Sequence, residues 1–174
     1  MFSGLYEHTL DAKGRLSLPS HFRELLRNCA TDIPTASSAQ AETEKTKAKT
    51  CDAKTSDAEL LIITTGIDRC LVAYPPARWR EFEDKLAKLS QFDPAVVQLK
   101  RIYVAGATEC PIDKHGRLLI PPMLREYAEL KTETVWAGMV TTIEIWARER
   151  WNEQVAQSRQ DPAAITKALT ELGL

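Results

Sequence analysis

The chain has 174 residues, 44% of them hydrophobic and 27% charged, which suits one globular domain or two very small units that share a core. Its formal net charge of -1 excludes a uniformly basic nucleic-acid binder, so any such role must depend on a local cluster of cations. The four cysteines form no Cys-x-x-Cys pair, the first residues carry no secretory signal, and no apolar run reaches the ~18 residues of a membrane span. We therefore expect a soluble protein of the cytoplasm, with reduced thiols and no membrane contact.

The first predicted unit contains the stretch LDAKGRLSLPSHFREL, residues 10–25. Asp11 and Gly14 hold the first and fourth positions that a type I turn favours, and Gly14 can adopt the positive φ that starts a bulged return strand. The short strand RLSLP follows and ends at Pro19. Apolar side chains then recur at helical spacing, which predicts a helix after Pro19.

A polar segment, residues 31–57, interrupts this unit and contains one large apolar side chain, Ile33. Such a segment cannot bury enough surface to offset the entropy lost on ordering, which predicts a flexible surface insertion. A short helix over 39–49 is the alternative, because Ala, Glu and Lys are frequent there. The segments ELLIITT and RCLVAY then predict a β-hairpin around Gly66. We assign residues 5–77 to the first unit.

Residues 78–106 link this unit to the next and contain most of two predicted helices, PARWREFEDKLAKL and DPAVVQLKRIYVAGA. Asp93 is the expected N-cap of the second helix, and Pro94 is its first residue. Residues 107–150 form the second predicted unit, and residues 151–174 carry the C-terminal helices. The apolar faces of these helices either cover the core or contact a neighbouring subunit, and the sequence leaves both options open.

The second unit repeats the first. A shift of 102 places IDKHGRLLIPPMLREY, residues 112–127, over residues 10–25, and seven of the sixteen positions are identical. A shift of 72 places residues 138–151 over residues 66–79, and the difference of 30 between the shifts corresponds to the insertion. A copy of about 45 residues is marginal as an independent fold. We therefore predict a β-rich α+β fold in which two copies complete one core around a pseudo-twofold axis.

The repeated residues also resemble a known family. The stretches MFSGLYEHTLDAKGRLSLPSHFREL, YPPARW, ATECPIDKHGRLLIPPMLREYAEL and IEIWARERW resemble the bacterial MraZ family, and the motif D-x-x-G-R occurs in both copies. The resemblance implies a swapped-hairpin β-barrel built from two AbrB-like repeats, assembled into a homo-oligomeric ring. It also implies a transcriptional regulator that binds repeated promoter sequences upstream of the division and cell-wall gene cluster and associates with the nucleoid.

The same resemblance implies that Arg15 and Arg117 contact double-stranded DNA. Arginine can read a guanine edge with two hydrogen bonds, whereas lysine mainly neutralises phosphate. We assign Arg15 as the base reader and Lys13 as a phosphate contact. Arg117 and Lys114 form either a second contact or a vestigial copy of the first.

The remaining residues of the predicted site have supporting roles. The turn-forming residues are Asp11, Gly14, Asp113 and Gly116. His21 and Arg23, on the first helix, are candidate contacts at the rim, and Arg27 and Arg125 also lie on the helices that follow the turns. An arginine beside a turn is often only a solvated or salt-bridged surface group, and this alternative stays open.

Other functions have weaker support. A protein that binds another protein through the ring and its helices is the main alternative, and a small barrel enzyme is a third. His8, His21, His115 and the cysteines lack the spacing of a zinc site, and Cys110 with His115 lacks an orienting acid. We therefore expect no enzyme activity, metal, cofactor or small-molecule substrate. The predicted core or interface anchors are Trp79, Trp136, Trp146 and Trp151.

Overall fold

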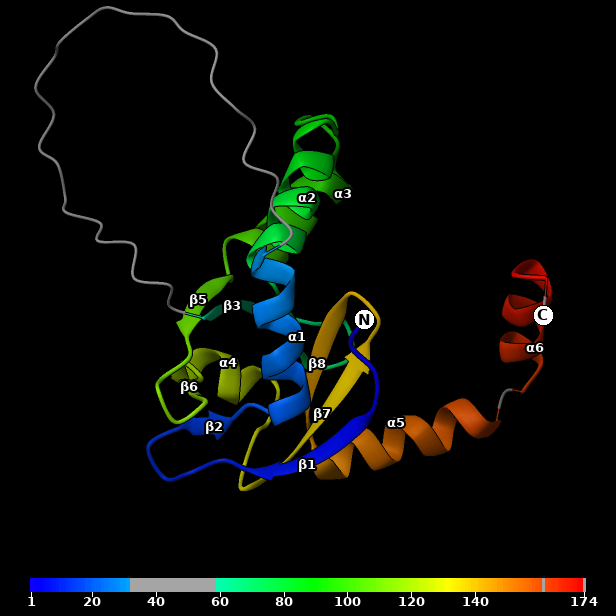
Figure 1. The fold of residues 1–174 in the computed structure, drawn as a ribbon. Helices are drawn as coiled ribbons and strands as arrows, with labels where there is room; N and C mark the ends of the chain where they lie inside the picture. The colour runs from blue at the N-terminus through cyan, green and yellow to red at the C-terminus, as the bar shows by residue number, and fades with distance from the viewer. Residues whose placement is uncertain (32–58, 161, 174) are drawn as a thin grey trace, which may run out of the picture.

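The computed structural model describes residues 1–31, 59–160 and 162–173. Except for Thr31, the predicted insertion and the alternative helix within it lie outside the described residues. The elements, drawn in Figure 1, are β1 (Leu5–Thr9), β2 (Arg15–Ser17), α1 (Ser20–Thr31), β3 (Leu60–Thr65), β4 (Leu71–Tyr74), α2 (Pro76–Ala87), α3 (Pro94–Leu99), the π-helical turn η1 (Lys100–Val104), β5 (Thr108–Pro111), β6 (Arg117–Leu119), α4 (Pro122–Tyr127), β7 (Glu133–Met139), β8 (Thr142–Ala147), α5 (Arg148–Gln160) and α6 (Pro162–Glu171).

The strands form an open six-stranded antiparallel sheet, in the order β1-β7-β8-β4-β3-β5, and a separate two-stranded ribbon of β2 and β6. The α+β class rich in strands is confirmed, but the described strands do not close into the expected barrel. Strands β2 and β6 have only three residues each, and they pair with one another. They meet the ends of β1 and β5 only through the single bridges Leu10–Leu16 and Ile112–Leu118.

The two copies are interleaved in this topology. Strand β1 of the first copy pairs with β7 of the second, and β5 of the second pairs with β3 of the first. The equivalent strands β2 and β6 pair with each other, as do β4 and β8. Apart from the hairpins β3–β4 and β7–β8, every pairing between these strands joins one copy to the other. Neither copy could therefore keep its sheet without the other.

One hydrophobic core takes side chains from both copies. The side chains of Leu16 and Leu118 point from the ribbon into this core. Phe22 of α1 packs edge-on against Tyr6, with ring centroids 4.9 Å apart. Trp136 of β7 is fully buried, as predicted. Full burial of a large apolar side chain stabilises a fold by about 1.5–3 kcal/mol, so this shared core holds the copies together.

The predicted helix from Asp93 is interrupted. The Asp93 carboxylate accepts from the backbone N–H of Ala95 at 2.9 Å, which confirms the N-cap. After Leu99 the helix widens, and the N–H of Ala105 donates to the carbonyl of Lys100 at 3.0 Å. The Thr64 hydroxyl donates to the carbonyl of Tyr103 at 2.6 Å, so a strand side chain satisfies a carbonyl of the widened turn.

The helices outside the core extend in two directions. Figure 1 shows α2 and α3 projecting together on one side, while α5 leaves the sheet on another and leads to α6. Trp146 at the end of β8 packs edge-on against Trp151 of α5, with ring centroids 5.7 Å apart. Among the described residues, no helix is long and apolar enough to cross a membrane.

Candidate nucleic-acid interface

The first D-x-x-G-R motif folds into the predicted turn. The Asp11 Oδ1 atom accepts from the backbone N–H of Lys13 at 2.9 Å and of Arg15 at 2.8 Å. The N–H of Gly14 donates to the Asp11 carbonyl at 2.9 Å, and Gly14 has a φ of +80°. The turn backbone thus favours an aspartate and a glycine at these positions.

The second motif repeats this geometry. The Asp113 Oδ1 atom accepts from the N–H of His115 at 2.8 Å and of Arg117 at 2.9 Å. Gly116 has a φ of +75°, and its N–H donates to the Asp113 carbonyl at 2.8 Å. In both turns the aspartate accepts from two backbone N–H groups and the glycine has a positive φ.

The ribbon places Arg15 and Arg117 on one face. Paired residues of antiparallel strands point to the same side, and successive residues point to opposite sides. Leu16 pairs with Leu118, and both are buried against the core, at 0% and 1% exposure. Arg15 and Arg117 flank these leucines on opposite strands, so both arginines lie on the outer face. The register is Arg15 with Leu119, Leu16 with Leu118, and Ser17 with Arg117.

Each turn arginine is oriented by the aspartate of its own turn. The Arg15 Nε donates to Asp11 Oδ2 at 2.6 Å, and the Arg117 Nε donates to Asp113 Oδ2 at 3.1 Å. The arginine side chains remain 36% and 33% exposed. The turn lowers the pKa of both carboxyl groups, chiefly because the arginine backbone N–H stabilises the charged form. Both guanidinium groups are thus held in place and accessible to solvent.

Two lysines and a histidine lie at the turn tips. Lys13, the predicted phosphate contact, is exposed, as are Lys114 and His115 of the second turn. The turns are also joined directly, because the N–H of Leu18 donates to the Gly116 carbonyl at 2.8 Å and the N–H of Ile120 donates to the Gly14 carbonyl at 2.9 Å. The structure therefore brings the cations of both copies to one end of the molecule.

A helix arginine from the opposite copy covers the glycine of each turn. A Cβ added to Gly14 would lie 2.7 Å from Cζ of Arg125, and one added to Gly116 would lie 3.1 Å from Nη1 of Arg23. The sequence predicts that both arginines lie on helices, but it did not predict that the arginine of each copy covers the turn glycine of the other copy. The shift of 102 that matches Arg23 with Arg125 was the available signal.

Arg23 is also held by a carboxylate that sequence reasoning did not single out. Its Nε donates to Glu59 Oε2 at 2.6 Å, and the other oxygen of Glu59 accepts from Nε of Arg27. Partial burial raises the pKa of the Glu59 carboxyl, but the hydrogen bonds from Arg23 and Arg27 outweigh this effect and keep the pKa below its ordinary value. The candidate rim contact Arg23 therefore carries a largely neutralised charge.

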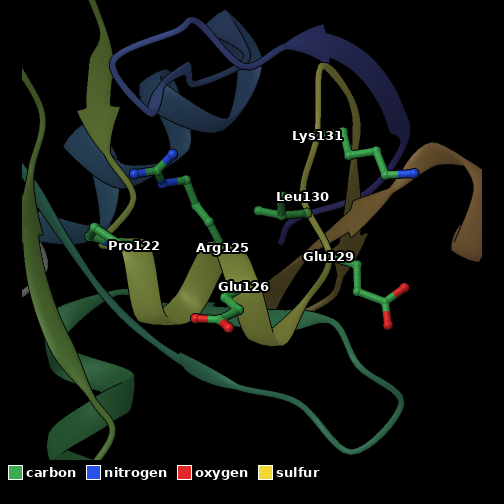
Figure 2. A pocket seen from close by; sticks show the side chains of 6 residues that line it. All are labelled: Pro122, Arg125, Glu126, Glu129, Leu130 and Lys131. Carbon is green, nitrogen blue, oxygen red and sulfur yellow. The ribbon is translucent and has the colours of Figure 1, made fainter.

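An open pocket of about 510 Å³ adjoins the interface, lined by Pro122, Arg125, Glu126, Glu129, Leu130 and Lys131. Figure 2 shows the Arg125 side chain extending from α4 toward the blue N-terminal segment, while the Glu126 carboxylate points the opposite way. The pocket is shallow and carries both signs of charge, unlike the enclosed apolar sites that bind small molecules.

The cysteines that the structure describes at side-chain level are buried. Burial raises the pKa of the Cys110 thiol to about 11, and burial together with nearby carboxylates raises that of Cys70 to about 12. A thiol with such a pKa is not a nucleophile at neutral pH. Within the described part of the chain, no group of three or more His, Cys, Asp or Glu side chains could hold a metal ion.

Comparison with known proteins identifies the family of the chain. The family model described as "MraZ protein, putative antitoxin-like" matches residues 1–30 and 103–172, which include both turns. The chain belongs to the MraZ family. "Transcriptional regulator MraZ" of Desulfitobacterium hafniense strain Y51 is 34% identical over the full length of both chains, and that of Caldicellulosiruptor saccharolyticus is 36% identical, also over both full lengths. The MraZ relatives are named as regulators and not as enzymes, which supports the prediction that this chain is not an enzyme.

Proposed function

We propose that this MraZ-family chain is a DNA-binding transcriptional regulator whose two turns present arginines to double-stranded DNA. The observation that carries the proposal is the shared outer face of the ribbon, where Arg15 and Arg117 are both oriented and exposed. The names of the relatives support the regulatory role. Arginines fixed in this way can donate two hydrogen bonds to a guanine in the major groove.

The surrounding cations supply the contacts that do not depend on base sequence. We assign Lys13 and Lys114 to phosphate, and we place Arg23 at the rim with a smaller contribution because Glu59 pairs with it. Contacts to phosphate fix the protein on the duplex, and contacts to base edges select the sequence. Arg15 is the main base reader, with Arg117 as the second.

The proposal includes a homo-oligomeric ring that binds repeated promoter elements upstream of the division and cell-wall gene cluster, in the cytoplasm and at the nucleoid. One subunit of net charge -1 offers few cations and should bind weakly. Linked subunits on spaced repeats gain affinity by effective concentration, on the order of 10²–10⁴-fold. Leu89, Phe92 and Ile102 are exposed on or beside the projecting helices, and Phe92 is 95% exposed, which supports a contact between subunits there.

The same proposal covers the finer description of the fold. We take the interleaved sheet and ribbon to be the swapped-hairpin arrangement of two AbrB-like repeats. Its support is the reciprocal pairing of β1 with β7 and of β5 with β3.

Titration of the DNA upstream of the chain's own gene tests this function. A labelled duplex of that region and a shuffled duplex of equal length are titrated with the protein at several salt concentrations, with fluorescence anisotropy as the readout. We expect tighter binding to the upstream duplex and a steep loss of affinity with salt, because bound cations release counterions. Equal affinity for both duplexes, or affinity that does not change with salt, would favour the alternative of a protein-binding assembly factor.

A further inference from the structure

The two helix arginines hold equivalent places but have different charge partners. Arg23, which covers Gly116, is 23% exposed and forms an ion pair with Glu59 at 2.6 Å. Arg125, which covers Gly14, donates from Nε to the carbonyl of Ile120 at 3.1 Å. In the part of the chain that the structure describes, no carboxylate forms an ion pair with Arg125. Among the described residues, the charge of Arg125 beside the first turn thus has no carboxylate partner, whereas the charge of Arg23 beside the second turn is paired with Glu59.

A residue difference outside the repeated motif accompanies this contrast. The carbonyl of Glu59 accepts from the N–H of Ile112 at 2.7 Å, and the carbonyl of Thr132 accepts from the N–H of Leu10 at 2.8 Å. Leu10 and Ile112 correspond under the shift of 102 between copies. Thr132 therefore occupies in the second copy the place that Glu59 occupies in the first. A threonine there offers no carboxylate to the nearby arginine.

Arg125 is also accessible to a ligand. It lines the open pocket, and Figure 2 shows its side chain extending toward the N-terminal segment. Glu126 points away from it, and the Glu129 carboxylate is occupied by Arg150 at 2.9 Å and by Arg69 at 2.9 Å. Because Nε is the atom that bonds Ile120, the two terminal nitrogens of Arg125 remain available as donors.

We propose that Arg125, although it belongs to the second copy, is a DNA phosphate contact of the first turn, and that Glu59 suppresses the equivalent contact at the second turn. This inference rests on the proposed DNA-binding function. An arginine beside Lys13 and Arg15 adds a charge-assisted donor where the first turn meets the duplex. The two turns therefore contribute unequally to binding, and the first turn contributes more.

The direct test compares Arg125→Gln with a control variant, Arg80→Gln. Arg80 is an exposed arginine of α2, a helix that is distant in sequence from both turns. The probe is the labelled duplex from upstream of the chain's own gene, titrated at several salt concentrations. Arg125→Gln should weaken binding on the order of tenfold and reduce the salt slope by about one for each engaged subunit. Arg80→Gln should change neither. Wild-type affinity and slope in Arg125→Gln would overturn the proposal.

A reciprocal exchange tests the role of Glu59 with Arg125 left in place. Thr132→Glu supplies the missing carboxylate and should reduce the affinity and the salt slope. Glu59→Thr releases Arg23 and should raise both. The unfolding midpoint of each variant shows whether it is folded. If both exchanges bind like wild type, the charge asymmetry has no effect on binding and the proposal fails.

The controls separate this inference from the proposed function. If the wild-type protein does not distinguish the upstream duplex from a shuffled one, the proposed function fails and this inference fails with it. If the wild type does distinguish them but Arg125→Gln is unaffected, the function stands and Arg125 is not a contact.

Discussion

The two turns of this molecule have almost the same backbone and different surroundings. Each has an aspartate that accepts from two N–H groups, a glycine with positive φ and an arginine bonded to the aspartate. Their environments differ: Glu59 pairs with Arg23 beside the second turn, whereas no carboxylate of the described residues forms an ion pair with Arg125 beside the first. The comparison shows that the repeated motif determines the shape of the turn, while residues outside the motif determine the charge beside it.

The largest effects are expected beneath the ribbon, where the copies are alike. Leu16→Ala and Leu118→Ala each remove a fully buried side chain and should lower the free energy of unfolding by about 2–5 kcal/mol. Because both leucines face the same shared core, we expect similar losses in urea unfolding. An exposed leucine on the outer face, Leu119, provides the control, and Leu119→Ala should cost much less. A large loss for only one of the two buried leucines would show that the core is not shared.

A smaller effect is expected at the turn glycines, where substitutions should cost the same stability in both turns but different amounts of DNA affinity. Gly14→Ala and Gly116→Ala both force a side chain into a left-handed conformation, which costs about 1–2 kcal/mol. The added Cβ at Gly14 would also displace the Arg125 guanidinium, whereas Arg23 remains tied to Glu59. We expect similar unfolding free energies and a greater loss of DNA affinity for Gly14→Ala. Equal losses of affinity for Gly14→Ala and Gly116→Ala would contradict the expectation that the first turn contributes more to binding.

The smallest effect concerns pH. The pKa values of Asp11 and Asp113 are lowered from 3.8 in the folded protein, chiefly by hydrogen bonds from the turn backbone. A carboxyl group with a lowered folded pKa contributes stability that is present above its unfolded pKa and is lost as the pH falls through the folded pKa. Asp11→Asn and Asp113→Asn should therefore each reduce the loss of stability on acidification below about pH 4, and by similar amounts. Urea unfolding over a pH series measures this, and an unchanged acid dependence in both variants would contradict it.

Local sequence patterns predicted most of the elements because their causes are local. The D-x-x-G-R turns, the helices after Pro19 and Pro121, the two hairpins and the Asp93 cap all depend on residues within a few positions of one another. The sequence did not predict the order of strands in the sheet, because that order depends on pairing between copies about a hundred residues apart. The interruption of the helix at Lys100 was also missed, since a distant strand residue, Thr64, bonds the widened turn.

The candidate site was predictable to a similar extent. Arg15, Arg117 and their turn residues follow from the motif, and the structure leaves both arginines oriented and exposed. The contact of Arg125 with Gly14 and the pairing of Arg23 with Glu59 join residues that are far apart in sequence. No sequence spacing predicts such a charge partner, so only the folded structure distinguishes Arg23, which Glu59 neutralises, from Arg125, which has no carboxylate partner among the described residues.

The most direct measurement is the binding of the upstream duplex by the double variant Arg15→Ala/Arg117→Ala. Its fold should persist, because the aspartates still accept from the turn backbone and the leucines of the ribbon stay buried. We predict that anisotropy titration will show an affinity no greater than that for a shuffled duplex, with Arg15→Ala alone costing more than Arg117→Ala alone. A folded double variant that binds the upstream duplex like wild type would contradict the claim that these turns hold the DNA.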